Sequence, residues 1–427
     1  MNRQRGMTMV ELMVSLAIVM LVIGTAATAY LKLLKTYRSQ GRLAESYMAN
    51  LTGLELLRYD IEMAGFGLPA NLGAGVNYSE AVEINPAPPF ASPNDPTTLN
   101  DAPSGVPRAF VHLDNKGANN SDVLAIKSNA ANIFDNPAAK KWSMITNASG
   151  AGPPLVVKWN DATMDFAAGD YFVALDNTGT LLTGPVSQWN NAFFTNASGP
   201  NGIPGCSANT PSASQIFYIY GIDNNVNNTT GTHRMPFNRV DYYLDTNGNA
   251  PSSCASGTYT LYRSAIDQAT GKQLNKTPLI DCVMDFQVAF GIDPSGNGSQ
   301  VVQWQENLLQ NAIPGGAQNA PMTTAQIQQY LREVRVFVLY SEGLADAGSS
   351  PPGILNLGDQ QIAAGLDSAH YTSTGTNFQQ WSSSALTGSP QLSSFSPAGA
   401  DLQYRWKIVE MAVKPNNLLN LAAGTSR

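Results

Sequence analysis

The residue with the clearest chemical consequence is Glu11, which stands at the start of a long apolar stretch. It is followed by Leu12–Leu31, 20 residues without a charge, and preceded by a short basic segment with Arg3 and Arg5. Twenty residues of helix span about 30 Å, the thickness of a bilayer's hydrocarbon core. A carboxylate at the edge of such a helix is costly unless it is paired, so Glu11 is predicted to have a function.

Three interpretations of this segment compete. A secretory signal could be cut at Ala27–Ala29, but its apolar region is normally shorter and would not begin with a carboxylate. A plain membrane anchor explains the length of the apolar run but not Glu11. It also conflicts with the positive-inside rule, because more basic residues follow the span than precede it. The basic residues that follow are Lys32, Lys35, Arg38 and Arg42.

The third interpretation rests on a resemblance. Gly6–Leu16 reads Gly-Met-Thr-Met-Val-Glu-Leu-Met-Val-Ser-Leu, which closely resembles the processing motif of type IV prepilins, although most members have Phe where Met7 stands. The resemblance implies that a prepilin peptidase cuts after Gly6 and methylates the new amine of Met7. It also implies that Glu11 pairs with the N-terminal amine of a neighbouring subunit and sets the register of a growing filament.

Several blocks farther along the chain look like parts of PilW-type minor pilins, and the large type II secretion pseudopilins are similar. The blocks are short, and their order along the chain carries the resemblance. They are Leu57–Gly67, Ser121–Leu124, Pro278–Asp293, Leu331–Val336 and Tyr404–Arg405. The chain is long for either group, with extra loops near residues 70–120 and 343–400.

The first helix is expected to continue far beyond the membrane, because no proline occurs before Pro69. From Met7 to the stop signal at Gly65–Pro69 it would measure about 55–60 residues. Its second half carries one apolar stripe, formed by Leu43, Tyr47, Leu51, Leu54, Leu57, Ile61 and Ala64. On another face, Arg58 is spaced for ion pairs with Glu55 and Glu62. The predicted organisation is a leader (1–6), a transmembrane or filament-core helix (7–31), an amphipathic continuation (32–65) and a β-rich head (66–427).

The head reads as short β-strands between loops rich in Gly, Pro, Asn and Ser, with a short helix over about 323–331. Along Ile280–Phe290 apolar residues alternate with polar ones, which predicts an antiparallel sheet with one covered face. The fold class is therefore α+β and pilin-like, with a long N-terminal helix packed on an antiparallel sheet in an enlarged head. The predicted strands are 122–127, 171–175, 215–220, 239–244, 259–263, 280–290, 334–340 and 404–413.

The three cysteines predict one disulfide and one remaining thiol, since the head would be exported to an oxidising compartment. Cys206 and Cys254 lie in polar loops, and Cys282 falls on the apolar side of its strand, where a free cysteine is common. We therefore expect a Cys206–Cys254 bond, with Cys254–Cys282 as the alternative.

Two loops have oxygen-bearing side chains that could bind calcium, namely Asp245-Thr246-Asn247-Gly248-Asn249 and Asp293-Pro294-Ser295-Gly296-Asn297. Both lack the acidic residue at the twelfth position of an EF-hand, and both follow a strand, where such residues make turns. We expect no bound cofactor. The chain has no GxSxG, HExxH, P-loop or dinucleotide motif, and His112, His233 and His370 are expected to be solvated rather than catalytic.

The composition of the chain excludes a further class of protein, those that bind nucleic acid. The chain has 427 residues, a net charge of −7 and only 13 % charged residues. An acidic protein without clustered Lys and Arg is not expected to bind nucleic acid.

The function that fits the sequence best is structural and not enzymatic. We expect a minor type IV pilin that helps to prime the pilus and stands at its tip. The alternatives are an adhesin delivered on a pilin anchor and a type II secretion pseudopilin.

The expected partners follow from this reading. They are the prepilin peptidase, other minor and major pilins, and the inner-membrane pilus assembly platform. Before assembly the chain would cross the inner membrane once with its head in the periplasm, and after assembly it would be part of a pilus at the cell surface.

Overall fold

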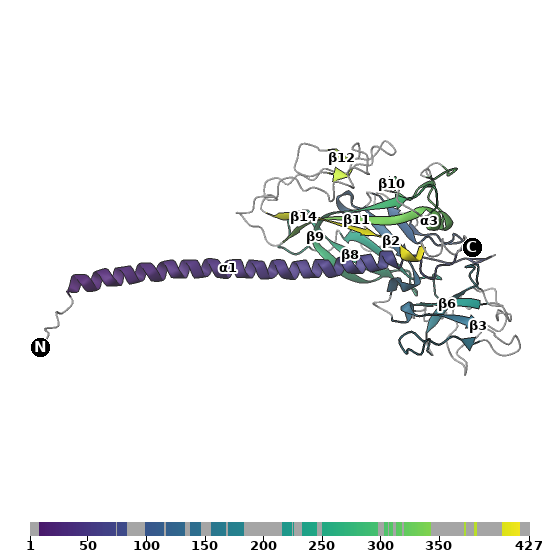
Figure 1. Ribbon diagram of the computed structural model, residues 1–427, viewed down its shortest axis with the longest axis horizontal. Helices are drawn as coiled ribbons and strands as arrows, with labels where there is room; N and C mark the ends of the chain where they lie inside the picture. The colour runs from purple at the N-terminus through teal and green to yellow at the C-terminus, as the bar shows by residue number, and fades with distance from the viewer. Residues whose placement is uncertain are drawn as a thin grey trace.

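The computed structural model joins a long N-terminal helix to a β-rich head (Figure 1). This arrangement confirms the predicted α+β class. The structure describes residues 8–73, 75–82, 99–114, 117–132, 137–146, 155–167, 170–182, 216–223, 225, 233–245, 250–297, 303–305, 307–310, 313–317, 320–342, 371–372, 380–381 and 404–418.

Helix α1 runs from Met9 to Glu62, 54 residues, and confirms the predicted long helix. Thr8 caps its first turn. Beyond its last turn Gly65 and Gly67 have φ angles of 82° and 70°, a left-handed conformation that side-chain-bearing residues rarely adopt, so the chain can leave the helix axis there. Figure 1 shows that the C-terminal part of α1 lies against the head, whereas the rest projects away from it.

The head is built on an eight-stranded sheet in the order β1-β2-β7-β8-β9-β11-β14, with β10 paired to β9. All of its strand pairs are antiparallel. The strands are β1 (Phe110–Leu113), β2 (Val123–Lys127), β7 (Arg239–Asp245), β8 (Tyr259–Ile266), β9 (Gln273–Ile292), β10 (Gln303–Gln305), β11 (Leu331–Glu342) and β14 (Arg405–Val413). Every strand predicted for this region is present, and helix α3 (Thr324–Tyr330) confirms the predicted short helix. Strands β1 and β10 were not predicted.

A second sheet forms a lobe beside the first, around β3 and β6 in Figure 1. Its order is β4-β3-β6-β5. The lobe contacts the turn that follows α1 through the rings of Phe66 and Tyr220, whose centroids are 5.0 Å apart. Its strands are β3 (Trp142–Thr146), β4 (Leu155–Val156), β5 (Tyr171–Leu175) and β6 (Ile216–Ile222). The remaining elements are the 3-10 helices η1 (Ala118–Asn120), η2 (Asn129–Asn132) and η3 (Pro137–Lys140) and the paired short strands β12 (Tyr371–Thr372) and β13 (Gln380–Trp381).

The main core lies between α1 and one face of the large sheet. Helix residues Leu57 and Ile61 are fully buried there, together with alternate residues of β9 and β11. The closest approach is at Gly53, where an added Cβ would lie 2.5 Å from the carbonyl oxygen of Leu279 in β9. Helix and sheet are therefore in backbone contact at this point, which leaves no room for a side chain.

A bulge interrupts the predicted alternation along β9. Tyr259 of β8 pairs with Val283, and Leu261 pairs with Ile280, so β9 carries an extra residue between the two pairs. Beyond the bulge Val283 faces the helix core. Met284, which was predicted to share that face, instead packs against Ala255 and Trp406.

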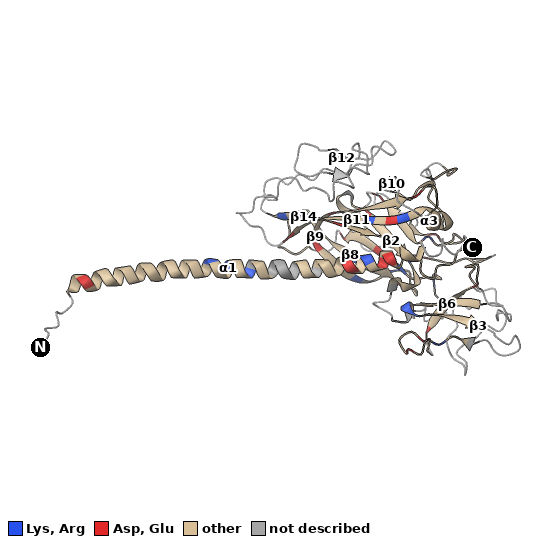
Figure 2. Cartoon of the chain, in the orientation of Figure 1, with Lys and Arg blue, Asp and Glu red and all other residues tan. Residues whose placement is uncertain are grey.

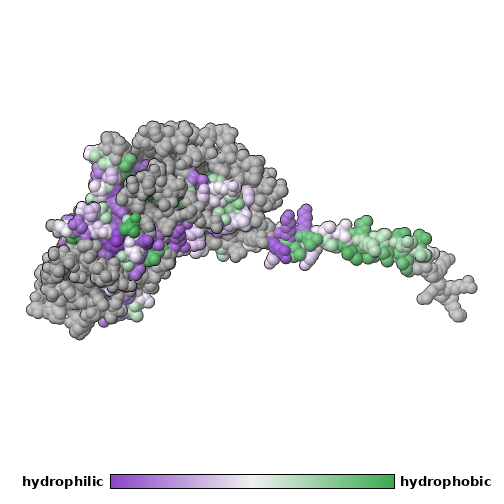
Figure 3. Space-filling view, turned by 180° about the vertical axis from the view of Figure 1, so that it is seen from behind, coloured by the Kyte–Doolittle hydropathy of each residue, from purple (hydrophilic) through white to green (hydrophobic). Residues whose placement is uncertain are grey.

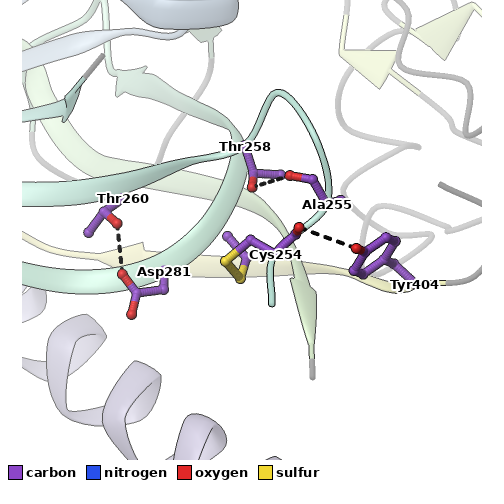
Figure 4. Close-up of a disulfide and its surroundings, with 7 residues drawn as sticks. Cys254, Ala255, Thr258, Thr260, Asp281 and Tyr404 are labelled. Atoms are coloured by element: carbon purple, nitrogen blue, oxygen red, sulfur yellow. Dashed lines mark hydrogen bonds between the residues drawn. A yellow bond between two sulfur atoms is a disulfide. The ribbon is translucent and has the colours of Figure 1, made fainter. Parts of the chain in front are cut away.

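The same bulge decides the disulfide. Cys282 has a φ of 59° and is bonded to Cys254 (Figure 4). The predicted Cys206–Cys254 bond is therefore wrong and the alternative is correct, because the bulge takes Cys282 out of the simple alternation that placed it in the helix-facing core. Cys206 lies outside the described residues. The bond closes a loop with a sequence separation of 28 residues, which stabilises the head by about 3–4 kcal/mol in the chain-entropy model.

Fully buried charges attach the segment before β1 to the large sheet. The Lys127 ammonium lies 2.8 Å from Glu80 and 2.7 Å from Asp101, and the Arg239 guanidinium lies 3.0 Å from Glu80 and 2.7 Å from Asp241. Burial of these charges is tolerated because each one has an opposite charge within hydrogen-bond distance. This network joins residues far apart in the sequence.

Candidate functional site

The candidate site is the part of α1 that projects beyond the head. We call Met9–Arg38 the stem. It is long and apolar enough to cross a membrane, and none of its most apolar window is buried against the head. Figure 3 shows an apolar surface along the outer part of the stem, with hydrophilic residues only toward the head, which is the opposite of what a helix in water presents. Length, composition and exposure together fit membrane anchoring.

The hydroxyl groups of the stem are suited to an apolar environment. Ser15 Oγ donates to the carbonyl oxygen of Leu12 at 2.9 Å, and Thr28 Oγ1 donates to that of Thr25 at 2.8 Å. Thr25 Oγ1 itself bonds the carbonyl oxygen of Val22 at 2.9 Å. These hydroxyls need no water, because each uses the helix backbone as its acceptor.

Glu11 takes part in the N-terminal cap of the stem. Its carboxylate accepts the backbone N–H of Thr8 at 3.0 Å, and Thr8 Oγ1 accepts the Glu11 N–H at 3.3 Å, which together form a capping box. The carboxylate thus lies at the positive end of the helix dipole, four residues after Met7 in the chain. Gly6 and Met7 lie outside the described residues. Their processing, and the pairing of Glu11 with a neighbour's amine, stay predictions.

Basic side chains gather where the stem approaches the head. Lys32, Lys35 and Arg38 are all exposed, and we call them the basic collar. Figure 2 shows blue on α1 between its long uncharged part and the head. The stem therefore carries one acidic residue near its free end and a positive group at its head-side end.

The other end of α1 is held on the sheet by a buried ion pair. Asp60 Oδ2 lies 2.6 Å from Arg263 Nε of β8 and accepts the Tyr242 hydroxyl of β7 at 2.5 Å. Burial alone would lower the pKa of Arg263, but the Asp60 carboxylate outweighs that effect and raises it. Burial, with the same carboxylate, raises the pKa of Tyr242 well above its ordinary value. This contact was not predicted, because Asp60 gives no local sign of its distant partner.

The exposed face of the same turn carries the ion pairs that the helical spacing predicted. Arg58 lies 3.0 Å from Glu62 and 3.8 Å from Glu55, and these side chains remain largely in contact with water. Exposed pairs of this kind contribute about 0–1 kcal/mol each. They support the helix locally and do not fix it to the head.

The proposed calcium ligands are engaged by protein groups. Asp245 lies 2.9 Å from the ammonium of Lys276, and Asp293 Oδ1 accepts the Ser295 backbone N–H at 3.0 Å, as in an Asx turn. The Asn297 backbone N–H also takes part in that turn, 3.4 Å from Ser295 Oγ. Asn247 and Asn249 lie outside the described residues. Within the described ranges, no group of three or more His, Cys, Asp or Glu side chains is placed to hold a metal ion.

Two histidines expected to be solvated are buried, so that expectation is wrong for them. His112 Nε2 lies 2.9 Å from Asp122, while His233 Nε2 lies 2.6 Å from the carbonyl oxygen of Asp223. Burial opposes the charged form of His112, but the Asp122 carboxylate outweighs it and raises the pKa of the imidazole. For His233 burial dominates and lowers the pKa to about 4. His370 lies outside the described residues.

Comparisons with known proteins identify the N-terminal segment. Residues 1–27 match the family model described as the prokaryotic N-terminal methylation motif. A solved structure of a type IV-like pilin from Thermus thermophilus is similar to the chain at 15 % identity, over 43 % of this chain and 69 % of that one, with a TM-score of 0.20. No curated protein matches the chain. The motif match supports the coarser prediction of a type IV pilin-like protein, while the assignment to PilW-type minor pilins stays a prediction.

Proposed function

We propose that this chain is a type IV pilin subunit, cleaved after Gly6 and N-methylated on Met7 by a prepilin peptidase. The observation that carries the proposal is the continuity of the methylation motif at residues 1–27 with an exposed apolar stem. The stem anchors the unassembled subunit in the inner membrane, with its head in the periplasm. In the filament the same apolar surface is covered by neighbouring stems, so burial is supplied by assembly.

We further propose a structural role as a minor pilin that primes the filament and stands at its tip, and not an enzymatic one. Support comes from the size of the head, where a second sheet lies beside the main sheet. A bulky subunit packs poorly in a uniform shaft, and a terminal position removes that conflict. The partners would be other minor pilins, the major pilin and the inner-membrane assembly platform.

Mass spectrometry of the mature N-terminus tests the proposal. We expect a first residue of N-methylated Met7 in wild-type cells, and the full leader in cells that lack the peptidase. A Gly6→Ala variant should keep its leader, because the peptidase recognises the residue before the cut. A mature chain that begins at Tyr30 would show an ordinary signal peptide and overturn the proposal.

The role of Glu11 in assembly needs a separate measurement. We expect Glu11→Ala to be cleaved almost normally but to enter filaments poorly, because the neighbour's amine would lack its partner. The measurement is the amount of the subunit in sheared pili relative to the amount in the membrane fraction. Glu11→Asp is the matched control, since it keeps the charge. Normal incorporation of Glu11→Ala would contradict the assigned role.

A further inference from the structure

We propose that the basic collar, Lys32, Lys35 and Arg38, binds the anionic headgroups of phospholipids in the leaflet on the head side of the membrane. The inference rests on the proposed anchoring of the stem and adds a lipid preference to it. The ligand is the phosphate of a lipid such as phosphatidylglycerol, which carries a net negative charge.

The position of the collar along α1 places it at headgroup depth. The uncharged run Leu12–Leu31 ends directly before Lys32, and its length as a helix, about 30 Å, equals the hydrocarbon thickness. The next two basic residues follow within about 9 Å of helix. Hence, when the apolar run spans the membrane, the three cations lie among the phosphates of one leaflet.

The collar is available for such a ligand. Its three side chains are exposed, and their spacing of three residues spreads them over about 120° of the helix surface. Within the described part of the chain, no acidic side chain forms an ion pair with any of the three. Along the sequence the nearest carboxylates are Glu11 and Glu45. Among the side chains of α1 that the structure describes, none neutralises these positive charges.

Two tyrosines strengthen the assignment to a membrane interface. Tyr30 precedes the collar and Tyr37 lies within it, between Lys35 and Arg38. The two side chains are 62 % and 74 % exposed, although neither contributes to the core of the head. A tyrosine ring has an apolar body and a polar hydroxyl, and such residues are enriched at the boundary between hydrocarbon and headgroups. A merely solvated basic face would give no reason for exposed aromatic residues beside and within it.

The charge of the whole chain favours a lipid partner for the collar. Removal of residues 1–6 takes away Arg3 and Arg5, so the formal side-chain charge changes from −7 to −9. A chain with that charge is repelled by an anionic leaflet unless cations stand between the head and the surface. The collar occupies that position, and each of its charges favours an anionic surface about fivefold.

Lipid selectivity of the mature chain, which begins at Met7 and lacks Arg3 and Arg5, tests the proposal in vesicles. The chain is reconstituted in phosphatidylcholine with a trace of spin-labelled phosphatidylglycerol or spin-labelled phosphatidylcholine, and electron paramagnetic resonance gives the immobilised fraction of each. The test variant carries Lys32→Gln, Lys35→Gln and Arg38→Gln. The matched control removes the same charge from exposed positions of the head, with Lys158→Gln, Arg405→Gln and Lys414→Gln. A third variant keeps the collar's charge, with Lys32→Arg, Lys35→Arg and Arg38→Lys.

Each immobilised lipid meets about one collar cation, so we expect about a fivefold preference per lipid for phosphatidylglycerol in the wild type, the head control and the charge-keeping variant. The collar variant should show no preference. High salt should weaken the preference. A wild type without preference, or a collar variant that keeps it, overturns the inference. So does a collar variant that keeps its lipid preference but fails to co-assemble with other pilins, since the collar would then bind protein. Resistance to alkaline carbonate extraction tests the anchoring of the stem separately from lipid binding by the collar. If the wild-type chain is extracted, the anchoring itself is refuted.

Discussion

The two ends of α1 are parts of one continuous helix in opposite environments. In the stem, large apolar side chains such as Leu12 and Ile23 are more than half exposed. The helix meets the sheet from Tyr47, whose ring centroid lies 5.9 Å from the Lys407 ammonium of β14, and Leu57 and Ile61 are completely buried. The backbone hydrogen bonds are the same in both parts, so the helix itself does not distinguish them. The difference shows that the head stabilises only the last few turns, and that the stem depends on a membrane or on neighbouring stems.

The apolar stripe of the helix extends farther than the surface it packs on. Tyr47 and Leu51 belong to the predicted stripe, but they are 52 % and 44 % exposed. Periodicity therefore predicted which side of the helix faces the head, but not where the contact begins. The start of the contact is set by the extent of the sheet, which is a property of other parts of the chain.

Asp60→Ala, at the head end of α1, should have the largest effect on the stability of the head. The substitution leaves Arg263 buried without its carboxylate, and we expect a loss of about 3–5 kcal/mol in the free energy of unfolding of the head. Denaturant unfolding of the full chain in detergent, followed by tryptophan fluorescence, measures it, because all tryptophans follow residue 66. Arg58→Ala, two residues away but exposed, should cost about 0–1 kcal/mol. Similar losses for both variants would contradict the anchoring role of Asp60.

The disulfide gives the next largest effect, and it too should act on the head alone. The double variant Cys254→Ala, Cys282→Ala should lose about 3–4 kcal/mol of head stability. Cys206→Ala should retain the bond. Peptide mapping of the non-reduced protein identifies the pair directly. Peptides joined through Cys206 would contradict the structure. Because the bond lies in the head, reductant should not change the helix content of the stem.

Glycine substitutions compare the two environments at the level of one methyl group. Gly53→Ala places a Cβ against the backbone of Leu279, so we expect a loss of about 1–3 kcal/mol from overpacking. At Gly41 the added Cβ has no atom within 4 Å, so Gly41→Ala should be neutral or increase helix stability by up to about 1 kcal/mol. The same denaturation assay compares them. A neutral Gly53→Ala would show that helix and sheet are not in close contact.

The smallest net effect is that of pH, because two buried groups act with opposite signs. Burial raises the pKa of Asp285 from 3.8 to about 7. The folded head therefore binds a proton that the unfolded chain releases, and this term stabilises the head as the pH falls from about 7 to 4. Burial lowers the pKa of His233 from 6.5 to about 4, so this term destabilises the head as the pH falls through the same window.

Variants separate these two contributions. The stability difference between the wild type and Asp285→Asn should grow in favour of the wild type as the pH falls from about 7 to 4, because only the wild type gains the bound proton. Asp281→Asn is the matched control, since that side chain lies on the same strand but is exposed. Denaturant titrations at several pH values give the two differences. A pH-independent difference for Asp285→Asn would place its carboxyl in contact with water.

Much of the fold was predictable because it depends on neighbouring residues. The absence of proline and the three-four spacing of apolar residues predicted α1, and β-rich runs predicted β2, β5 and β11 close to their observed bounds. The bulge in β9 was not predictable in this way. One extra residue at that point changes the direction of Cys282, and no local pattern marks it. The face of Met284 and the disulfide were therefore assigned wrongly, whereas Ile280, Phe286, Val288 and Phe290 lie in the core as predicted.

The sequence by itself determined the stem, the processing motif and the position of Glu11, because each depends on residues that are adjacent or a few positions apart. Only the tertiary structure decided what Asp60, Cys254 and His112 contact. The partners of Asp60 and Cys254 lie in strands far away along the chain, and the pairing of β1 with β2 brings Asp122 to His112. Burial of a charged or polar group also depends on everything that packs around it, and that surrounding is assembled from the whole head.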